Sequence, residues 1–369
     1  MEKRMHKLGI SVYPEHSTPE KDYEYMKLAA KYGFSRIFTC LLSVDKPKGE
    51  IIAEFSDFIG KAHELGYVVA ADTNPHVFKH LGATPYDLSV FGNMGLDIIR
   101  LDGNFGELED RLITRNPQGI KIEFNASSDV SVDHLIRHGA DPNNITMCHN
   151  FYPERYTGLS RTVFDKFNEK WKGLGLNTAA FVSSNNTNTY GPWPVYNGLC
   201  TVEADRGLPI DLQVRHLLAT EMIDDILIGN AYASEEELKA MSQVDMTKTT
   251  IALSTVEGLN ETELRVLKDF HHSGRSDASE YFIRSSMPRV SCKDKSIPYR
   301  ECSREKFVRG DVVIVNDNLS HYRGEVEVIL KEIPNDGERN LAGRIPEEEL
   351  LILEFMEEQP DHFWDFLIR

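Results

Sequence analysis

Three carboxylates stand at corresponding points of three successive strand-like runs. Asp72, Asp102 and Glu123 each follow a short apolar run directly, and each has an asparagine two residues downstream. An apolar run followed by a carboxylate, an amide and a helical segment is the repeating unit of a parallel α/β barrel. Because the chemistry of such barrels lies at the carboxyl ends of the strands, we expect the three carboxylates to share one mouth.

Paired carboxylates are the groups that glycoside hydrolysis requires. One carboxyl group must be protonated and the other ionised, and crowding them into a partly dry cleft raises one pKa. A simpler interpretation is that each strand-end acid only caps the next helix, but its repetition in three units favours a shared site. We therefore predict that Asp102 and Glu123 are the acid and the nucleophile or base, and that Asp72 tunes their pKa values.

Strands and helices must alternate around these carboxylates to position them. Eight strand-like runs, each followed by a helical segment, can be counted in residues 1–245. This number predicts an α/β fold of the TIM-like (β/α)8 barrel type. The competing fold is an open doubly wound sheet, which needs a glycine-rich phosphate loop after its first strand. The segment that stands there, Tyr13-Pro14-Glu15-His16, is not such a loop.

The pattern changes after about Lys248. Strand-like runs at 249–253, 312–315, 324–330 and 350–353 are separated by turn-rich loops, with one helical segment between them. We therefore expect residues 246–369 to form a smaller, mostly β, barrel-like domain.

Composition excludes several classes of partner and cofactor. The net charge of −17 argues against nucleic acid or an anionic membrane surface as a partner. The five cysteines are scattered and favour reduced thiols. Neither a signal-peptide core nor a run of roughly 18 to 20 apolar residues is found. We expect a cytoplasmic protein without a metal or cofactor, because the sequence has no His/Cys cluster of metal-site spacing.

Amides and aromatic residues at the strand ends are candidates for contacts with a sugar. Asparagine side chains can donate to and accept from hydroxyl groups without adding charge, although asparagine is also a common turn residue. His149 is a candidate proton shuttle, against the simpler interpretation of a structural histidine. The aromatic candidates for stacking against a ring are Tyr13, Phe151, Tyr152, Tyr190, Trp193 and Tyr196.

An arginine-rich segment, residues 271–289, is unusual in this acidic chain. It contains Arg275, Arg284 and Arg289 but no lysine. The planar guanidinium binds phosphate or carboxylate in a bidentate manner. The alternative is a solvated linker or a salt-bridged seam. A second candidate position for a phosphate is the Ser183-Ser184-Asn185 turn after strand seven, where barrels often bind one.

The motifs together resemble one known family, the MupG-type 6-phospho-N-acetylmuramidases, over essentially the whole chain. They are Gly9-Ile10-Ser11-Val12-Tyr13-Pro14-Glu15-His16-Ser17, Asp72-Thr73-Asn74-Pro75, Arg100-Leu101-Asp102-Gly103, Glu123-Phe124-Asn125-Ala126-Ser127 and His149-Asn150-Phe151-Tyr152-Pro153. The resemblance implies a TIM-like barrel followed by a cyclophilin-like β-barrel domain. It also implies cytoplasmic cleavage of the β-1,4 bond in N-acetylmuramic acid 6-phosphate–N-acetylglucosamine, in bacterial peptidoglycan recycling.

The implied partner is a small phosphorylated amino-sugar disaccharide, with a homo-oligomer as an open option. Contacts with it are expected from Tyr13, Glu15, Asn74, Arg100, Asn125, His149, Asn150, Tyr152, Ser183, Asn185, Asn230, Arg275, Arg284 and Arg289. In a variant of the mechanism, the acetamido group of the substrate is the nucleophile. Two further alternatives are a non-catalytic sugar-phosphate sensor and a phosphosugar aldolase or isomerase. The latter would need a Schiff-base lysine or a metal, and Lys121 is the only lysine inside a predicted barrel strand.

Overall fold

The computed structural model describes residues 6–369. The preceding residues, where we expected no leader sequence, lie outside the described part of the chain. Contacts divide the protein into two compact units, each described by itself below. The first ends at Val244 and the second begins at Asp245, except that Leu218–Thr220 is grouped with the second unit.

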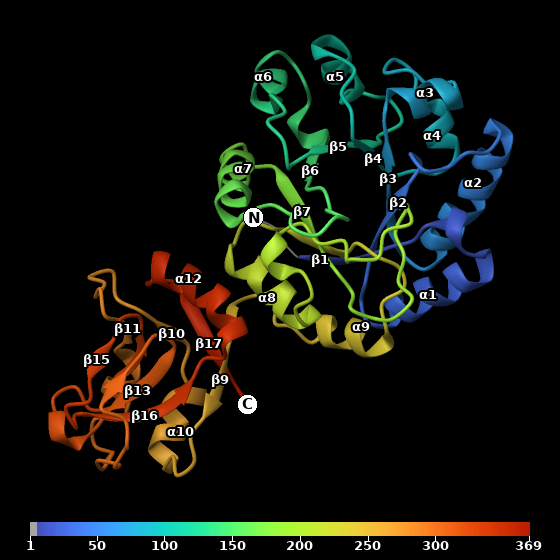
Figure 1. The fold of residues 1–369 in the computed structure, drawn as a ribbon. Helices are drawn as coiled ribbons and strands as arrows, with labels where there is room; N and C mark the ends of the chain where they lie inside the picture. The colour runs from blue at the N-terminus through green and yellow to red at the C-terminus, as the bar shows by residue number, and fades with distance from the viewer. Residues whose placement is uncertain (1–5) are drawn as a thin grey trace. The chain divides into compact units, whose positions relative to one another are not determined.

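The first unit is a closed barrel of eight parallel strands in sequential order, as predicted (Figure 1). The strands are β1 (Lys7–Ser11), β2 (Arg36–Cys40), β3 (Val68–Thr73), β4 (Ile98–Leu101), β5 (Lys121–Asn125), β6 (Ile145–Cys148), β7 (Asn177–Val182) and β8 (Asp225–Ile228). They are buried almost throughout, because helices cover the outside and side chains fill the inside.

Helices connect the strands and surround the barrel (Figure 1). They are α1 (Pro19–Lys31), α2 (Lys48–Glu64), α3 (Pro75–Leu81), α4 (Ser89–Asn93), α5 (Glu107–Ile113), α6 (Val132–Arg137), α7 (Arg161–Gly173), α8 (Ile210–Ala219) and α9 (Glu235–Ser242), with short 3-10 helices η1 (Pro14–His16), η2 (Pro142–Asn144) and η3 (Glu203–Asp205). Helix α3 was not predicted, although an asparagine before a proline is a helix start signal.

Strand register sets four polar side chains beside one another in the barrel. Cys40, Asp72, Arg100 and Glu123 pair in turn across β2, β3, β4 and β5. Since side chains alternate along a strand, residues that pair directly across neighbouring strands lie on the same side of the sheet. Phe38, Phe181 and other apolar side chains form the core of the barrel around this polar level.

The second unit is mostly β, as predicted. Seven strands form a sheet in the order β10-β17-β9-β16-β13-β14-β11, and β12 pairs with β15. Their bounds are β9 (Thr249–Thr255), β10 (His272–Ser273), β11 (Phe282–Ser285), β12 (Lys306–Phe307), β13 (Asp311–Val315), β14 (Val326–Ile329), β15 (Ile333–Pro334), β16 (Arg339–Arg344) and β17 (Phe363–Ile368).

One predicted strand of the second unit is wrong. Residues 350–353 form the first turn of a helix, α12 (Leu350–Glu358), which follows the short 3-10 helix η5 (Glu347–Glu349). Ile352, Leu353, Phe355 and Met356 are buried, which is helical spacing and not the alternation of a strand. The other helices of this unit are α10 (Glu261–Lys268), α11 (Met287–Ser291) and η4 (Asp317–Leu319). No helix within residues 6–369 is both long and apolar enough to cross a membrane.

Candidate active site

Arg100, on β4, joins two of the predicted carboxylates. Its side chain is buried, and Nη1 donates hydrogen bonds to Oδ1 of Asp72 at 2.8 Å and to Oδ1 of Asp102 at 3.0 Å. Nη2 donates to Oδ1 of Asn150. The guanidinium therefore ties together the carboxyl ends of β3, β4 and β6, and it holds two carboxylates that would otherwise repel each other.

The two carboxylates lie in different environments. The Asp72 side chain is 5% exposed and that of Asp102 is 41% exposed. Burial raises the pKa of Asp72 to about 6, although the Arg100 guanidinium opposes this rise. Because both bond to one nitrogen, their Oδ1 atoms lie at most 5.8 Å apart, the combined length of the two hydrogen bonds. The arrangement supplies one carboxyl group that is readily protonated and another that is open to solvent.

A cavity of about 180 Å³ adjoins this pair. Its lining combines aromatic and polar side chains, and consists of Phe38, Asp72, Arg100, Asp102, His149, Asn150, Phe151, Phe181 and Trp193. The Phe151 ring lies 5.2 Å from that of Phe181 and 6.3 Å from that of Trp193, measured between centroids. An aromatic lining with a few polar groups is typical of small-molecule sites.

Glu123 was predicted to act with Asp102, but its side chain bonds to other residues. Its side chain is fully buried, forms an ion pair with Arg36 and accepts a hydrogen bond from Thr146 at 3.2 Å. Arg36 in turn donates to Asp225 at 2.5 Å. Glu123 is also absent from the cavity lining. The physical reason is that Arg36, buried inside the barrel, needs counter-charges, and Glu123 and Asp225 supply them.

His149 and Asn150 follow β6, and the structure gives them different surroundings. His149 is fully buried, with Nε2 3.1 Å from Oδ1 of Asn168 and Nδ1 3.1 Å from Oγ of Ser127. Burial lowers the pKa of His149 to about 4, so the imidazole is neutral. Both ring nitrogens are thus occupied by protein groups, whereas Asn150 is half-buried at the cavity and bonds to Arg100.

Tyr13 and Glu15 lie at the end of β1. Tyr13 is a core residue whose hydroxyl donates to the carbonyl of Gly229 at 2.6 Å, which leaves its ring within the barrel cluster. Glu15 accepts a hydrogen bond from Ser43 at 2.5 Å, and its Oε2 is buried without a hydrogen-bond partner among residues 6–369. Burial raises the pKa of Glu15. Tyr152 is half-buried after β6.

Three of the predicted amides have local structural partners. Asn74 caps α3 by accepting from the Val77 amide at 2.9 Å, and Asn125 accepts from the Ser127 amide at 2.9 Å. Asn230 is buried and bonds to the backbone of Ser184 with both ends of its amide. These are the turn and cap roles that asparagine commonly takes.

The turn after β7 is filled by protein acceptors. The backbone amide of Ser183 donates to Gln213, that of Ser184 to Asn230, and that of Asn185 to Glu237. A phosphate at this turn would have to displace these partners and face the Glu237 carboxylate.

The predicted arginines and the lysine of the aldolase alternative do not belong to the cavity lining. Arg275, Arg284 and Arg289 belong to the second unit, so their contact with the substrate stays a prediction. Lys121 is exposed at the amino end of β5, the end opposite to the one that carries the cavity. Within residues 6–369, no three His, Cys, Asp or Glu side chains are grouped so as to hold a metal ion.

Two residues that were not predicted, Glu203 and Arg206, hold the loops beside the cavity. Glu203 accepts from the backbone amides of Tyr156 and Gly158 at 2.7 and 2.8 Å. Arg206 bonds to Glu203 and donates to the carbonyls of Tyr152 and Asn197, both at 2.9 Å. Arg206 hydrogen bonds lower the pKa of Glu203 to about 2. The ion pair thereby joins the loop that carries Phe151 to the loop that carries Trp193.

Phe38, Phe181 and Arg36 were also not predicted. Phe38 and Phe181 line the cavity from inside β2 and β7. Their alternation with outward-facing residues was the available signal, but it cannot be read in strands that are apolar on both faces. Arg36 could have been recognised as a partner for a buried carboxylate, because it is a charged residue in an otherwise apolar strand.

Two parts of one protein family together match nearly the whole chain. Residues 8–243 match the family described as 6-phospho-N-acetylmuramidase, N-terminal, and residues 249–363 match 6-phospho-N-acetylmuramidase, C-terminal. No curated protein matches. Among solved structures, an uncharacterized B. cereus protein is 42% identical, with a TM-score of 0.89 over 98% of this chain and 99% of that one. A conserved Enterococcus faecalis protein with an unknown function is 24% identical, with a TM-score of 0.68 over 98% and 96%.

Proposed function

The chain belongs to the 6-phospho-N-acetylmuramidase family, and we propose that this glycosidase hydrolyses the β-1,4 bond of N-acetylmuramic acid 6-phosphate–N-acetylglucosamine. The proposal places the reaction in the cytoplasm, in the recycling of peptidoglycan fragments. One observation carries the catalytic part of the proposal. Asp72 and Asp102 meet on a single nitrogen of Arg100, beside a cavity with aromatic walls.

The two aspartates are suited to different roles. Asp72, with a pKa of about 6, is about one-tenth protonated at pH 7 and mostly protonated below pH 6, and it is the general acid in our proposal. It donates its proton to the oxygen that leaves with N-acetylglucosamine. Asp102, more exposed and bonded to Arg100, is the anion that stabilises positive charge developing at the anomeric carbon. This replaces Glu123 as the partner of Asp102, because Glu123 is committed to Arg36.

The short separation of the two carboxyl groups favours a retaining reaction. Retaining glycosidases place their carboxyl groups about 5 to 5.5 Å apart, whereas inverting enzymes leave about 6.5 to 9.5 Å for a water molecule. The facing oxygens of Asp72 and Asp102 lie at most 5.8 Å apart. Asp102 then either attacks the anomeric carbon or orients the acetamido group of the substrate for that attack. Both routes retain the β configuration.

Aromatic walls of the cavity support binding of a sugar ring. Phe151 and Trp193 line the cavity with apolar rings, and the half-buried Asn150 lines it with a polar amide. Arg100 holds the Oδ1 atom of Asn150, so the amide is fixed in one orientation at the cavity. Such a combination of an apolar face with a few oriented polar groups gives affinity and orientation together.

The substrate is tested by incubating the protein with the phosphorylated disaccharide beside its unphosphorylated form and following the products by mass spectrometry. We expect N-acetylmuramic acid 6-phosphate and N-acetylglucosamine from the phosphorylated form alone. Cleavage of both forms would support glycosidase activity but show that the substrate phosphate is not required. Binding without cleavage of either, by folded protein, would contradict the proposal and favour a sugar-phosphate sensor.

A further inference from the structure

We propose that the second unit carries its own binding site for a phosphate group, formed by Arg275, Arg284 and Arg289. Arg275 follows β10, Arg284 lies in β11, and Arg289 lies in α11. The structure thus gathers three arginines from three elements of one unit. The inference goes beyond the proposed function and does not depend on it, because the site is complete within the second unit.

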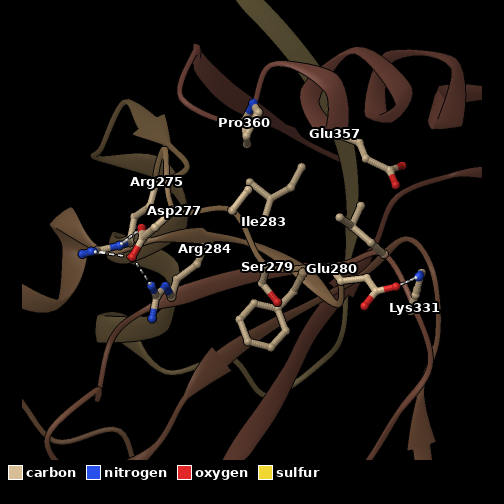
Figure 2. A pocket seen from close by; sticks show the side chains of 12 residues that line it. Arg275, Asp277, Ser279, Glu280, Ile283, Arg284, Lys331, Glu357 and Pro360 are labelled. Atoms are coloured by element: carbon tan, nitrogen blue, oxygen red, sulfur yellow. Dashed lines mark hydrogen bonds and ion pairs between the residues drawn. The ribbon is translucent and has the colours of Figure 1, made fainter.

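A carboxylate already occupies the position of an anion between two of these arginines. Asp277 accepts from Nε of Arg275 at 2.6 Å and from Nη2 at 2.9 Å, a bidentate pair. Its Oδ2 also lies 3.7 Å from Nη2 of Arg284. Figure 2 shows the carboxylate between the two guanidinium groups. Arginine uses this fork geometry for carboxylates and phosphates alike, so Asp277 marks where a phosphate would lie.

Asp277 is poorly fixed in that position. Its side chain is 61% exposed, and the pair with Arg275 spans only two residues of a loop. An ion pair between exposed side chains contributes little stability, about 0 to 1 kcal/mol. A phosphate dianion can therefore replace the carboxylate, which is then free to turn toward water.

Arg284 and Arg289 have unused donors. Arg284 lies 3.9 Å and Arg289 4.0 Å from Oε1 of Glu325, which is beyond hydrogen-bonding distance. In the described part of the chain, neither guanidinium donates a hydrogen bond to another residue. Glu325 is buried and accepts from Ser286, so it holds the two arginines nearby without saturating them. A third carboxylate, Glu327, pairs in register with Arg284 on the neighbouring strand and is taken by Arg339, to which it bonds at 2.7 Å.

Space for a ligand adjoins these groups. A cavity of about 140 Å³ is bordered by Arg275, Asp277 and Arg284 at one end and by Glu280 and Lys331 at the other. Figure 2 shows Ile283 between the two polar ends. Glu280 pairs with Lys331 at the far end, whereas within residues 6–369 the Arg284 guanidinium has no ion pair shorter than 3.7 Å, so the phosphate in our proposal binds at the arginine end.

Titration of the full-length protein with inorganic phosphate tests the site. The Nε–Hε resonances of arginine would be followed by NMR at constant ionic strength, with glucose 6-phosphate in a parallel titration. We expect saturable shifts for Arg275, Arg284 and Arg289. Tighter binding of the sugar phosphate would identify a phosphosugar ligand and equal binding would identify free phosphate, and both results support the site.

Two variants should change the affinity for phosphate in opposite directions. Arg284→Gln should weaken phosphate binding roughly tenfold or more, because it removes a charge-assisted contact. Asp277→Asn should tighten it several-fold, because it removes the competing carboxylate. The matched control is Arg265→Gln, since Arg265 is an exposed arginine of α10 that pairs with Asp269, and it should change nothing. Shifts that grow linearly without saturation, or a weakened affinity in Asp277→Asn with normal thermal unfolding, would overturn the proposal.

Discussion

A single nitrogen of Arg100 hydrogen-bonds to both Asp72 and Asp102, at 2.8 and 3.0 Å. The guanidinium brings together a buried and an exposed carboxyl group at the carboxyl ends of β3 and β4. It also keeps the Asp72 pKa from rising further, because a neighbouring positive charge favours the ionised form. The catalytic asymmetry that we propose depends on this relationship.

Activity should fall as the pH rises above about 6. The acid must be protonated to work, and the Asp72 pKa is about 6, so kcat/KM should drop roughly tenfold per pH unit on the alkaline side. Asp72→Asn should lower turnover by about 10²-fold to 10⁴-fold and abolish this decrease on the alkaline side, the alkaline limb of the pH profile. Asp22→Asn is the matched control, because Asp22 is another buried aspartate with a raised pKa and lies outside the cavity lining. An unchanged alkaline limb in Asp72→Asn would contradict its role as the acid.

The same group should make folding stability depend on pH. Unfolding returns the Asp72 pKa from about 6 toward its usual 3.8, so between these values the folded state binds more protons than the unfolded state. Stability should therefore fall as the pH rises from about 4 to above 6, by on the order of 3 kcal/mol. Urea unfolding at several pH values measures this slope. The dependence of the unfolding free energy on pH should be weaker in Asp72→Asn. The same dependence in that variant and in the wild type would show that other groups cause it.

Asp102 and Glu123 should respond differently to neutralisation. Asp102→Asn should reduce turnover by orders of magnitude with normal unfolding, because its side chain is 41% exposed at the cavity. Glu123→Gln should mainly lower the free energy of unfolding, by about 3 to 5 kcal/mol, since it leaves Arg36 short of a buried counter-charge. Paired measurements of kcat and urea unfolding distinguish the two. A folded Glu123→Gln enzyme with kcat reduced as far as that of Asp102→Asn would restore Glu123 to the catalytic pair.

The strand-end carboxylates illustrate what sequence could predict and what it could not. Asp72 and Asp102 were predicted to share the mouth because each stands at the end of an apolar strand-like run, and the carboxyl ends of parallel strands meet there. Glu123 occupies the same kind of position, yet its side chain bonds to Arg36. That partner comes from a strand 87 residues earlier, and only the closure of the barrel brings the two together.

The remaining differences have local causes. Asn74 contributes to a helix cap because Pro75 begins α3, and a cap and a ligand contact use the same residue type. Residues 350–353 form part of a helix because the apolar pattern continues beyond them at helical spacing, and a run of four apolar residues alone does not distinguish strand from helix.

The ion pair between Glu203 and Arg206 should affect substrate binding more than chemistry. Glu203→Gln would weaken the bonds that hold the Tyr156 and Gly158 amides, and so loosen the loop beside the cavity. We expect KM to rise several-fold with kcat nearly unchanged, because this loop positions the sugar and touches no reacting atom. Steady-state kinetics measures this, with the exposed Glu154→Gln on the same loop as the control. A fall in kcat with unchanged KM would contradict the assignment.

The configuration of the first product tests the central claim most directly. Proton NMR during rapid cleavage of the phosphorylated disaccharide reports the anomer of N-acetylmuramic acid 6-phosphate before mutarotation. Because the facing oxygens of Asp72 and Asp102 lie at most 5.8 Å apart, closer than the roughly 6.5 to 9.5 Å that inverting enzymes leave for a water molecule, we predict that the β anomer appears first. Initial appearance of the α anomer would show inversion and would contradict the assignment of this pair.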